Sequence, residues 1–138
     1  MRQGEAVFVD SGAWIALALS RDPLHMHARE QWELLQGAGA NLHTSVPVVI
    51  ETFTLLDRNA NRDVALAWKE SVYKRGSVQI LPCELRDLEQ SWEYFRRVDL
   101  HKLSAVDATS FVIMKRARIR LAYTFDHHFA VVGFRLVA

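Results

Sequence analysis

The chain has 138 residues, half of them hydrophobic, and a formal charge of +1 from 17 basic and 16 acidic side chains. This length and composition predict one globular domain over residues 1–138 and exclude a disordered chain. The single cysteine, Cys83, excludes an internal disulfide framework, and no apolar run is long enough to cross a membrane, so we expect a cytoplasmic protein.

Apolar runs and helical periodicities alternate along the chain. Residues 6–9 form a short apolar run that predicts a buried strand, followed by a helix from Ser11. A helix ending at Gly37 comes next, and Ser45 with Pro47 predicts the start of another helix over residues 46–58. Further helices are expected near residues 63–76, 85–95 and 104–114, and further strands near residues 42–44, 78–81, 120–125 and 134–137.

This alternation predicts a fold of the α/β class. Strands that alternate with helices form a parallel sheet with helices on both faces. The connections are short and no linker divides the chain. We therefore expect a three-layer α/β/α sandwich with a central parallel sheet.

Four acids occupy related places in this predicted fold. Asp10 and Asp126 follow the strands at residues 6–9 and 120–125, whereas Glu51 and Asp107 fall in the first turns of helices. The carboxyl ends of parallel strands and the amino ends of the following helices share one edge of the sheet. Clustered carboxylates repel one another, and a bound Mg²⁺ or Mn²⁺ would relieve this repulsion. Each acid also has a simpler interpretation, because aspartates and glutamates commonly begin helices and turns.

Four segments in order carry a resemblance to a known family: VFVDSGAWIAL (7–17), VVIETFTLLDR (48–58), LSAVDATSFVIMKR (103–116) and AYTFDHHFAVVGF (122–134). Together they resemble the PIN domain family, specifically the VapC-type toxins of toxin–antitoxin modules. The resemblance implies a PIN-like sandwich and a metal-dependent endoribonuclease. It also implies that Asp10, Glu51, Asp107 and Asp126 are catalytic, metal-binding acids, and that the partners are RNA, a small antitoxin and a second copy of the chain.

Other residues have weaker signals. The hydroxyls of Ser11 and Thr124 lie beside predicted ligands and could orient a carboxylate or a water molecule. Arg58 and Arg62 are candidates for contacts with RNA phosphates, although a solvated helix face explains them equally well. His128 follows Asp126 closely, but one adjacent acid is not enough for a zinc site, so we expect it to take part in local packing.

Two alternatives remain open at this point. A phosphatase of the haloacid dehalogenase class also has an aspartate after its first strand, but it needs a second acid at the position occupied here by Gly12. A PIN-like binding or scaffold module without catalysis is the other alternative. A titration with Mn²⁺ would distinguish it, because a scaffold should not bind the ion at the acids.

Overall fold

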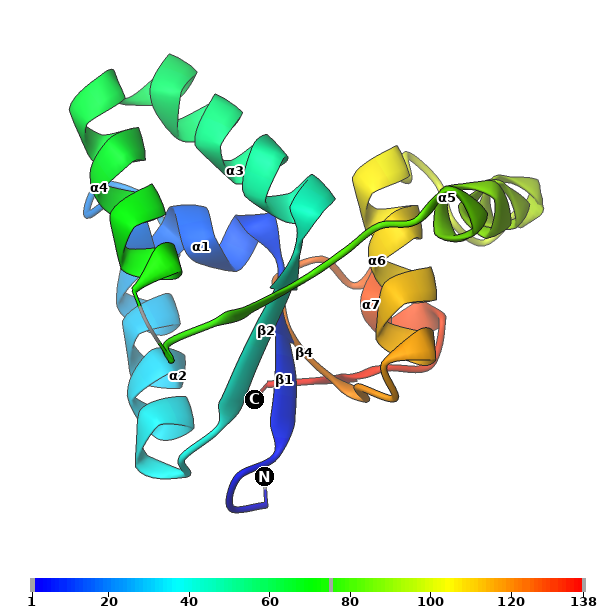
Figure 1. The fold of residues 1–138 in the computed structure, drawn as a ribbon, viewed down its shortest axis with the longest axis horizontal. Helices are drawn as coiled ribbons and strands as arrows, with labels where there is room; N and C mark the ends of the chain where they lie inside the picture. Colours follow the sequence, from blue (N-terminus) through cyan, green and yellow to red (C-terminus); the bar gives the residue numbers. More distant parts are fainter. Residues whose placement is uncertain (1, 75, 138) are drawn as a thin grey trace.

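The computed structural model describes residues 2–74 and 76–137, and it contains one five-stranded parallel sheet between two groups of helices (Figure 1). The strand order is β3-β2-β1-β4-β5, and every neighbouring pair is parallel. The strands are β1 (Ala6–Val9), β2 (Asn41–Ser45), β3 (Gln79–Leu81), β4 (Leu121–Tyr123) and β5 (Arg135–Leu136). The predicted α/β class and parallel sheet are confirmed.

The helices of the first half of the chain lie on one side of the sheet, and those of the second half lie on the other (Figure 1). The first group comprises α1 (Ser11–Ala18), α2 (His25–Gly37), α3 (Val46–Asn59) and α4 (Arg62–Tyr73). The second comprises α5 (Leu85–Ser91), the 3₁₀ helix η1 (Trp92–Arg96), α6 (Ala105–Arg116) and α7 (His128–Val131). None of the helices in the described ranges is long and apolar enough to cross a membrane.

The two helices that carry Glu51 and Asp107 begin at serine caps. The hydroxyl of Ser45 accepts the backbone N–H of Val48 at the start of α3, and that of Ser104 accepts the N–H of Asp107 at the start of α6. Each bond satisfies an amide that has no partner within the helix. Both helices start where the sequence predicts. Asp107 lies in the first turn of α6, as expected, but Glu51 is the sixth residue of α3 and lies in its second turn rather than its first.

The core is centred on β1, which is buried along its length and lies between β2 and β4. On one face, Trp14 packs against Trp32 and Trp68 at ring-centroid distances of 6.1 and 5.9 Å. On the other, Phe111 of α6 packs edge-on against Phe129 of α7 at 4.9 Å. These aromatic contacts pack one helix group against each face of the sheet. The edge of the sheet between the two helix groups is therefore held firmly enough to position a site.

Three sequence predictions need correction. The strand expected over residues 120–125 ends at Tyr123, and the helix expected over residues 85–95 becomes a 3₁₀ helix after Ser91. The short helix α7 was not predicted. Asp87 is buried, a placement that its local sequence did not predict: its carboxylate caps α5 and forms an ion pair with Arg116 at 2.9 Å.

Candidate active site

Asp10 lies between β1 and α1, at the carboxyl edge of the sheet, and only 4% of its surface is exposed. Its side chain does not cap α1, so the simple capping interpretation does not account for it. Instead Oδ2 accepts a hydrogen bond from the hydroxyl of Thr124 at 2.9 Å. The other oxygen, Oδ1, is buried and has no hydrogen-bond partner among the described residues. A buried carboxylate oxygen without a partner is costly, and a cation would satisfy it.

Thr124 connects two of the predicted acids. Its hydroxyl donates to Asp10 and also accepts the backbone N–H of Asp126 at 3.0 Å. It follows β4, the strand that pairs with β1, so the two strand ends bring Asp10 and Asp126 into one region. The hydroxyl of Thr124 therefore contacts a predicted ligand, as the sequence predicts.

Glu51 is held by the second predicted hydroxyl. Ser11, the first residue of α1, donates to Oε1 of Glu51 at 2.5 Å. Helices α1 and α3 pack against each other, and this bond joins them beside Asp10. Ser11 thus orients Glu51 in the same way that Thr124 orients Asp10.

Asp107 and Asp126 form a closer group with His128. One candidate ligand atom from each of the three lies within 4.8 Å of those of the other two. Asp126 accepts the backbone N–H of His128 at 2.9 Å, and its carboxylate also contacts Nδ1 of the buried imidazole. The sequence analysis assigned His128 to packing alone. Its ring is buried, as packing requires, but it also positions Asp126, and the aspartate–x–histidine spacing was the available signal.

The acids change one another's ionisation. Burial, assisted by the charges of Glu51 and Asp126, raises the pKa of Asp10 to about 6, against the hydrogen bond from Thr124. Burial and the charges of the other three acids raise the pKa of Asp107 to about 9. Burial also raises the pKa of Asp126, but hydrogen bonds from Asp107 and His128 outweigh it and lower that pKa on balance. The four acids therefore share one electrostatic environment in which full ionisation is unfavourable without a cation.

The donor set fits a hard divalent cation. Carboxylate oxygens are the ligands that Mg²⁺ and Mn²⁺ prefer, and the partnerless Oδ1 of Asp10 is an available one. The closest three-residue group contains Asp107, Asp126 and His128, whereas the mutual charge effects include Asp10 and Glu51 as well. The four acids therefore belong to one site, in which Asp107, Asp126 and His128 form the tightest group.

The predicted RNA contacts Arg58 and Arg62 are not brought to the acids. Both lie at the end of α3 and the start of α4, away from the amino end of α3 that carries Glu51. The guanidinium of Arg62 forms a two-bond ion pair with Asp57. This ion pair joins the end of α3 to the start of α4, so Arg62 has a local structural contact rather than one with the acids.

The chain is similar to known proteins in sequence and in fold. The sequence pattern of the PIN domain matches residues 7–135. A protein named 23S rRNA-specific endonuclease VapC20, from two strains of Mycobacterium tuberculosis, is 36% identical over 129 residues, which are 93% of this chain and 95% of that protein.

Two solved structures are also similar. The crystal structure of Mycobacterium tuberculosis VapC20, described as a sarcin–ricin loop cleaving toxin, has a TM-score of 0.81 and 33% identity, covering 93% of this chain and 95% of that one. The structure of VapBC2 from Rickettsia felis, bound to a DNA fragment from its promoter, has a TM-score of 0.70 over 95% and 96% of the two chains. At 10% identity the second shows a common fold only.

Proposed function

The chain belongs to the PIN domain family, and on this premise we propose that it is a metal-dependent endoribonuclease, the toxin of a toxin–antitoxin module. The observation that carries the proposal is the buried Asp10, with one oxygen held by Thr124 and the other without a partner, among three further acids. The phosphatase alternative is set aside, because the family match covers residues 7–135.

Asp10, Glu51, Asp107 and Asp126 are the residues proposed to hold Mg²⁺ or Mn²⁺. When bound, such an ion lowers the pKa of a coordinated water and offsets negative charge on the phosphate. Thr124 leaves Oδ1 of Asp10 free for a ligand by holding Oδ2, and Ser11 fixes the direction of Glu51. An ionised carboxylate at this edge can accept the proton of the attacking water. No serine or cysteine nucleophile is needed for this hydrolysis.

We propose ribosomal RNA in the cytoplasm as the substrate class. The support is the name of the 36% identical relative, which specifies 23S rRNA, and the sarcin–ricin loop in the description of its structure. A small antitoxin as partner is proposed from the same resemblance. A homodimer is also proposed, with exposed apolar side chains on α3 and α4 as its support.

The test is cleavage of a synthetic RNA stem–loop with the sarcin–ricin sequence. Wild-type protein with Mn²⁺ should cut it, and the chelator EDTA should stop the reaction. Asp10→Asn keeps the size of the side chain but removes its charge, so we expect a loss of at least about 100-fold in kcat with an unchanged circular dichroism spectrum. Asp126→Asn should lose less, because its carboxylate is partly engaged by His128.

The matched control is Asp63→Asn, which removes an acid from the first turn of α4, outside the cluster. It should cut RNA as wild type does. Cleavage that continues in EDTA, or that survives Asp10→Asn, would show that the acidic cluster is not the catalyst.

A further inference from the structure

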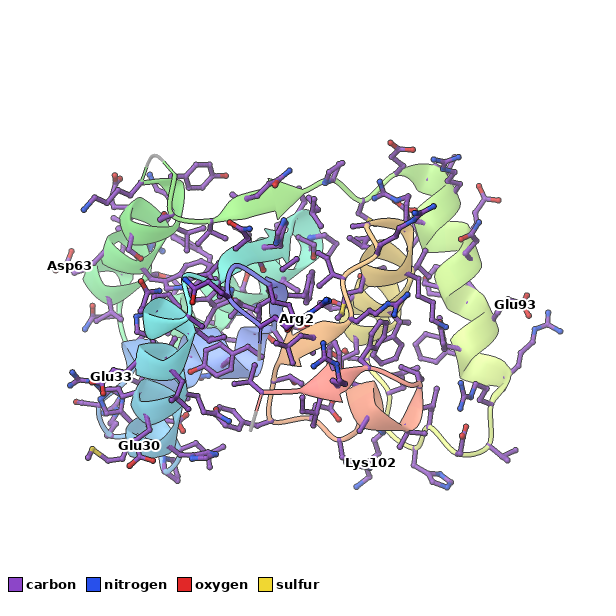
Figure 2. The ribbon with its side chains drawn as sticks, turned by 90° about the horizontal axis from the view of Figure 1, so that it is seen from below. Arg2, Glu30, Glu33, Asp63, Glu93 and Lys102 are labelled. Carbon is purple, nitrogen blue, oxygen red and sulfur yellow. The ribbon has the colours of Figure 1, made fainter. Side chains whose placement is uncertain are left out.

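A second polar pocket lies at the edge of the sheet opposite the acids. It has a volume of about 660 Å³ and lies at the amino ends of β1, β4 and β5. Four arginines line it: Arg2, Arg118, Arg120 and Arg135. Figure 2 looks onto this edge, with Arg2 near the centre of the view. We call this region the arginine pocket.

One of the four positive charges is neutralised within the pocket. Arg135 forms an ion pair with Glu5, and the backbone N–H of Arg2 donates to the same carboxylate. Burial raises the pKa of Glu5, but these contacts with Arg2 and Arg135 outweigh it and lower the pKa, so Glu5 is ionised at neutral pH. The side chains of Arg2, Arg118 and Arg120 have no ion pair with another described residue, and a local excess of positive charge remains.

Arg118 occupies a backbone position that favours glycine. It follows the C-cap of α6 with φ at +58°, in the left-handed region. The N–H of Ile119 donates to the carbonyl of Met114 at 2.9 Å and that of Arg118 to Lys115 at 3.2 Å, which is the bonding pattern of a Schellman motif. Glycine adopts this conformation without a Cβ penalty, whereas arginine does not. The conformation therefore does not explain the arginine, and its guanidinium in the pocket does.

We propose that the arginine pocket binds a backbone phosphate of the RNA substrate at a distance from the cleavage site. This inference rests on the proposed function. Guanidinium groups match phosphate oxygens in charge and in planar, two-bond geometry. The pocket is lined by no apolar side chain larger than Ala6, so it offers no hydrophobic anchor to a protein partner. These features favour RNA over an acidic protein as the occupant.

The distance between the two sites sets the size of RNA that can reach both. Helix α6 carries Asp107 in its first turn and ends two residues before Arg118. Its 12 residues span about 18 Å at about 1.5 Å per residue. A duplex strand advances about 3.4 Å per nucleotide, so in a duplex stem about five nucleotides separate the cut from the bound phosphate. A stem–loop can therefore reach both sites, whereas a dinucleotide is too short to reach both even when fully extended.

The experiment compares the double variant Arg118→Gly/Arg120→Gln with wild type on these two RNAs. Binding of the stem–loop is measured by fluorescence anisotropy in EDTA at several salt concentrations, and cleavage of both RNAs is measured with Mn²⁺. We expect weaker stem–loop binding and a salt-dependence slope that is smaller by about 1, because one phosphate contact is lost. Cleavage of the short RNA should not change. The melting temperature should not fall, because glycine suits position 118.

Arg86→Gln/Arg96→Gln is the control, since it removes the same charge from exposed positions on α5 and η1. It should leave the slope unchanged. Three results would overturn the arginine pocket as an RNA site. The control variant could lose as much stem–loop binding as the double variant, the double variant could lose as much cleavage of the short RNA as of the stem–loop, or it could bind the stem–loop as wild type does. Binding of polyglutamate that depends on Arg118 and Arg120, while RNA binding does not, would overturn it in favour of an acidic peptide. Failure of wild type to cut either RNA would instead contradict the proposed function.

Discussion

Among single residues, Thr124 connects two members of the acidic cluster, Asp10 and Asp126. Its hydroxyl restrains one oxygen of Asp10 and receives the N–H of Asp126. Groups that orient ligands in this way are commonly as important to a metal site as the ligands themselves. The structure therefore makes the role of Thr124 testable apart from the role of the acids.

Thr124→Val keeps the shape of the side chain and removes both hydrogen bonds. We expect Mn²⁺ affinity, measured by titration calorimetry, to fall by about 10- to 100-fold. Thr124→Ser restores the hydroxyl and should recover most of the affinity. An unchanged Mn²⁺ affinity in Thr124→Val would mean that Asp10 needs no such support.

The positions of single site residues could be predicted from the sequence where a local pattern, such as a strand end or a helix cap, determines them. Asp10 after an apolar run and Asp107 behind Ser104 were identifiable because a strand end and a capped helix each place one side chain. Asp87 was misjudged because its burial depends on Arg116, which is 29 residues away. The contact between His128 and Asp126 also depends on the short α7, whose four residues are too few for a periodic pattern.

At the scale of elements, α3 and α4 expose an unusual apolar surface. Tyr73 and Ile50 are each 62% exposed, and they line one groove of about 500 Å³ with Val49 and Phe53. Exposed apolar patches of this kind mark interfaces between proteins. They are the structural support for the proposed homodimer.

Tyr73→Glu should shift the protein toward the monomer by at least about tenfold in dissociation constant, because the charge would be buried at the interface. Sedimentation velocity over a range of concentrations measures this. Leu85→Glu is the matched control, since Leu85 is 72% exposed on α5, and it should leave the association unchanged. A wild-type protein that stays monomeric at all concentrations would contradict the homodimer, and equal effects of the two variants would contradict the α3–α4 surface.

Element types were predictable from periodicity, but several ends were not. Strand β4 stops at Tyr123, and the chain turns after it, where the hydroxyl of Thr124 donates to Asp10 and accepts the N–H of Asp126. Helix α5 tightens into η1 at Trp92, where Trp92 and Phe95 pack on each other at 6.2 Å. Such ends are decided by tertiary contacts, which lie outside a local sequence window.

At the scale of the whole molecule, the acidic cluster links stability to pH. The pKa values of Asp10 and Asp107 are raised to about 6 and about 9 in the folded state, above the ordinary value of 3.8. Protonation of these groups therefore favours folding. Their contribution is complete below about pH 4 and is lost as the pH rises through these raised values.

In EDTA, the free energy of unfolding should fall as the pH rises from 5 to 9, first as Asp10 and then as Asp107 loses its proton. Urea unfolding at several pH values measures this change. Asp107→Asn should flatten the dependence, because it removes the group with the highest pKa. Saturating Mn²⁺ should reverse the trend at high pH, since the ion binds ionised carboxylates and stabilises the folded state. Stability that rises with pH in EDTA would contradict the mutual repulsion of the acids.

The convergence of the four acids was predictable only through the topology. Asp10, Glu51, Asp107 and Asp126 are far apart in sequence, and a parallel sheet brings the ends that carry them to one edge. The arginine pocket was not predictable by the same reasoning, because all four of its arginines lie outside regular elements or at the first residue of one. Only the folded chain places them together.

The bond between Thr124 and Asp10 also sets the moment during synthesis at which the site is completed. A ribosome makes Asp10 and Glu51 early, but strand β4 and the hydroxyl that orients Asp10 come 114 residues after that aspartate. A chain interrupted before Leu121 therefore lacks Thr124, Asp126 and β4, one of the two strands that pair with β1. Under the proposed function, we expect such an unfinished chain not to cut the RNA of the ribosome that is making it, because its site is incomplete.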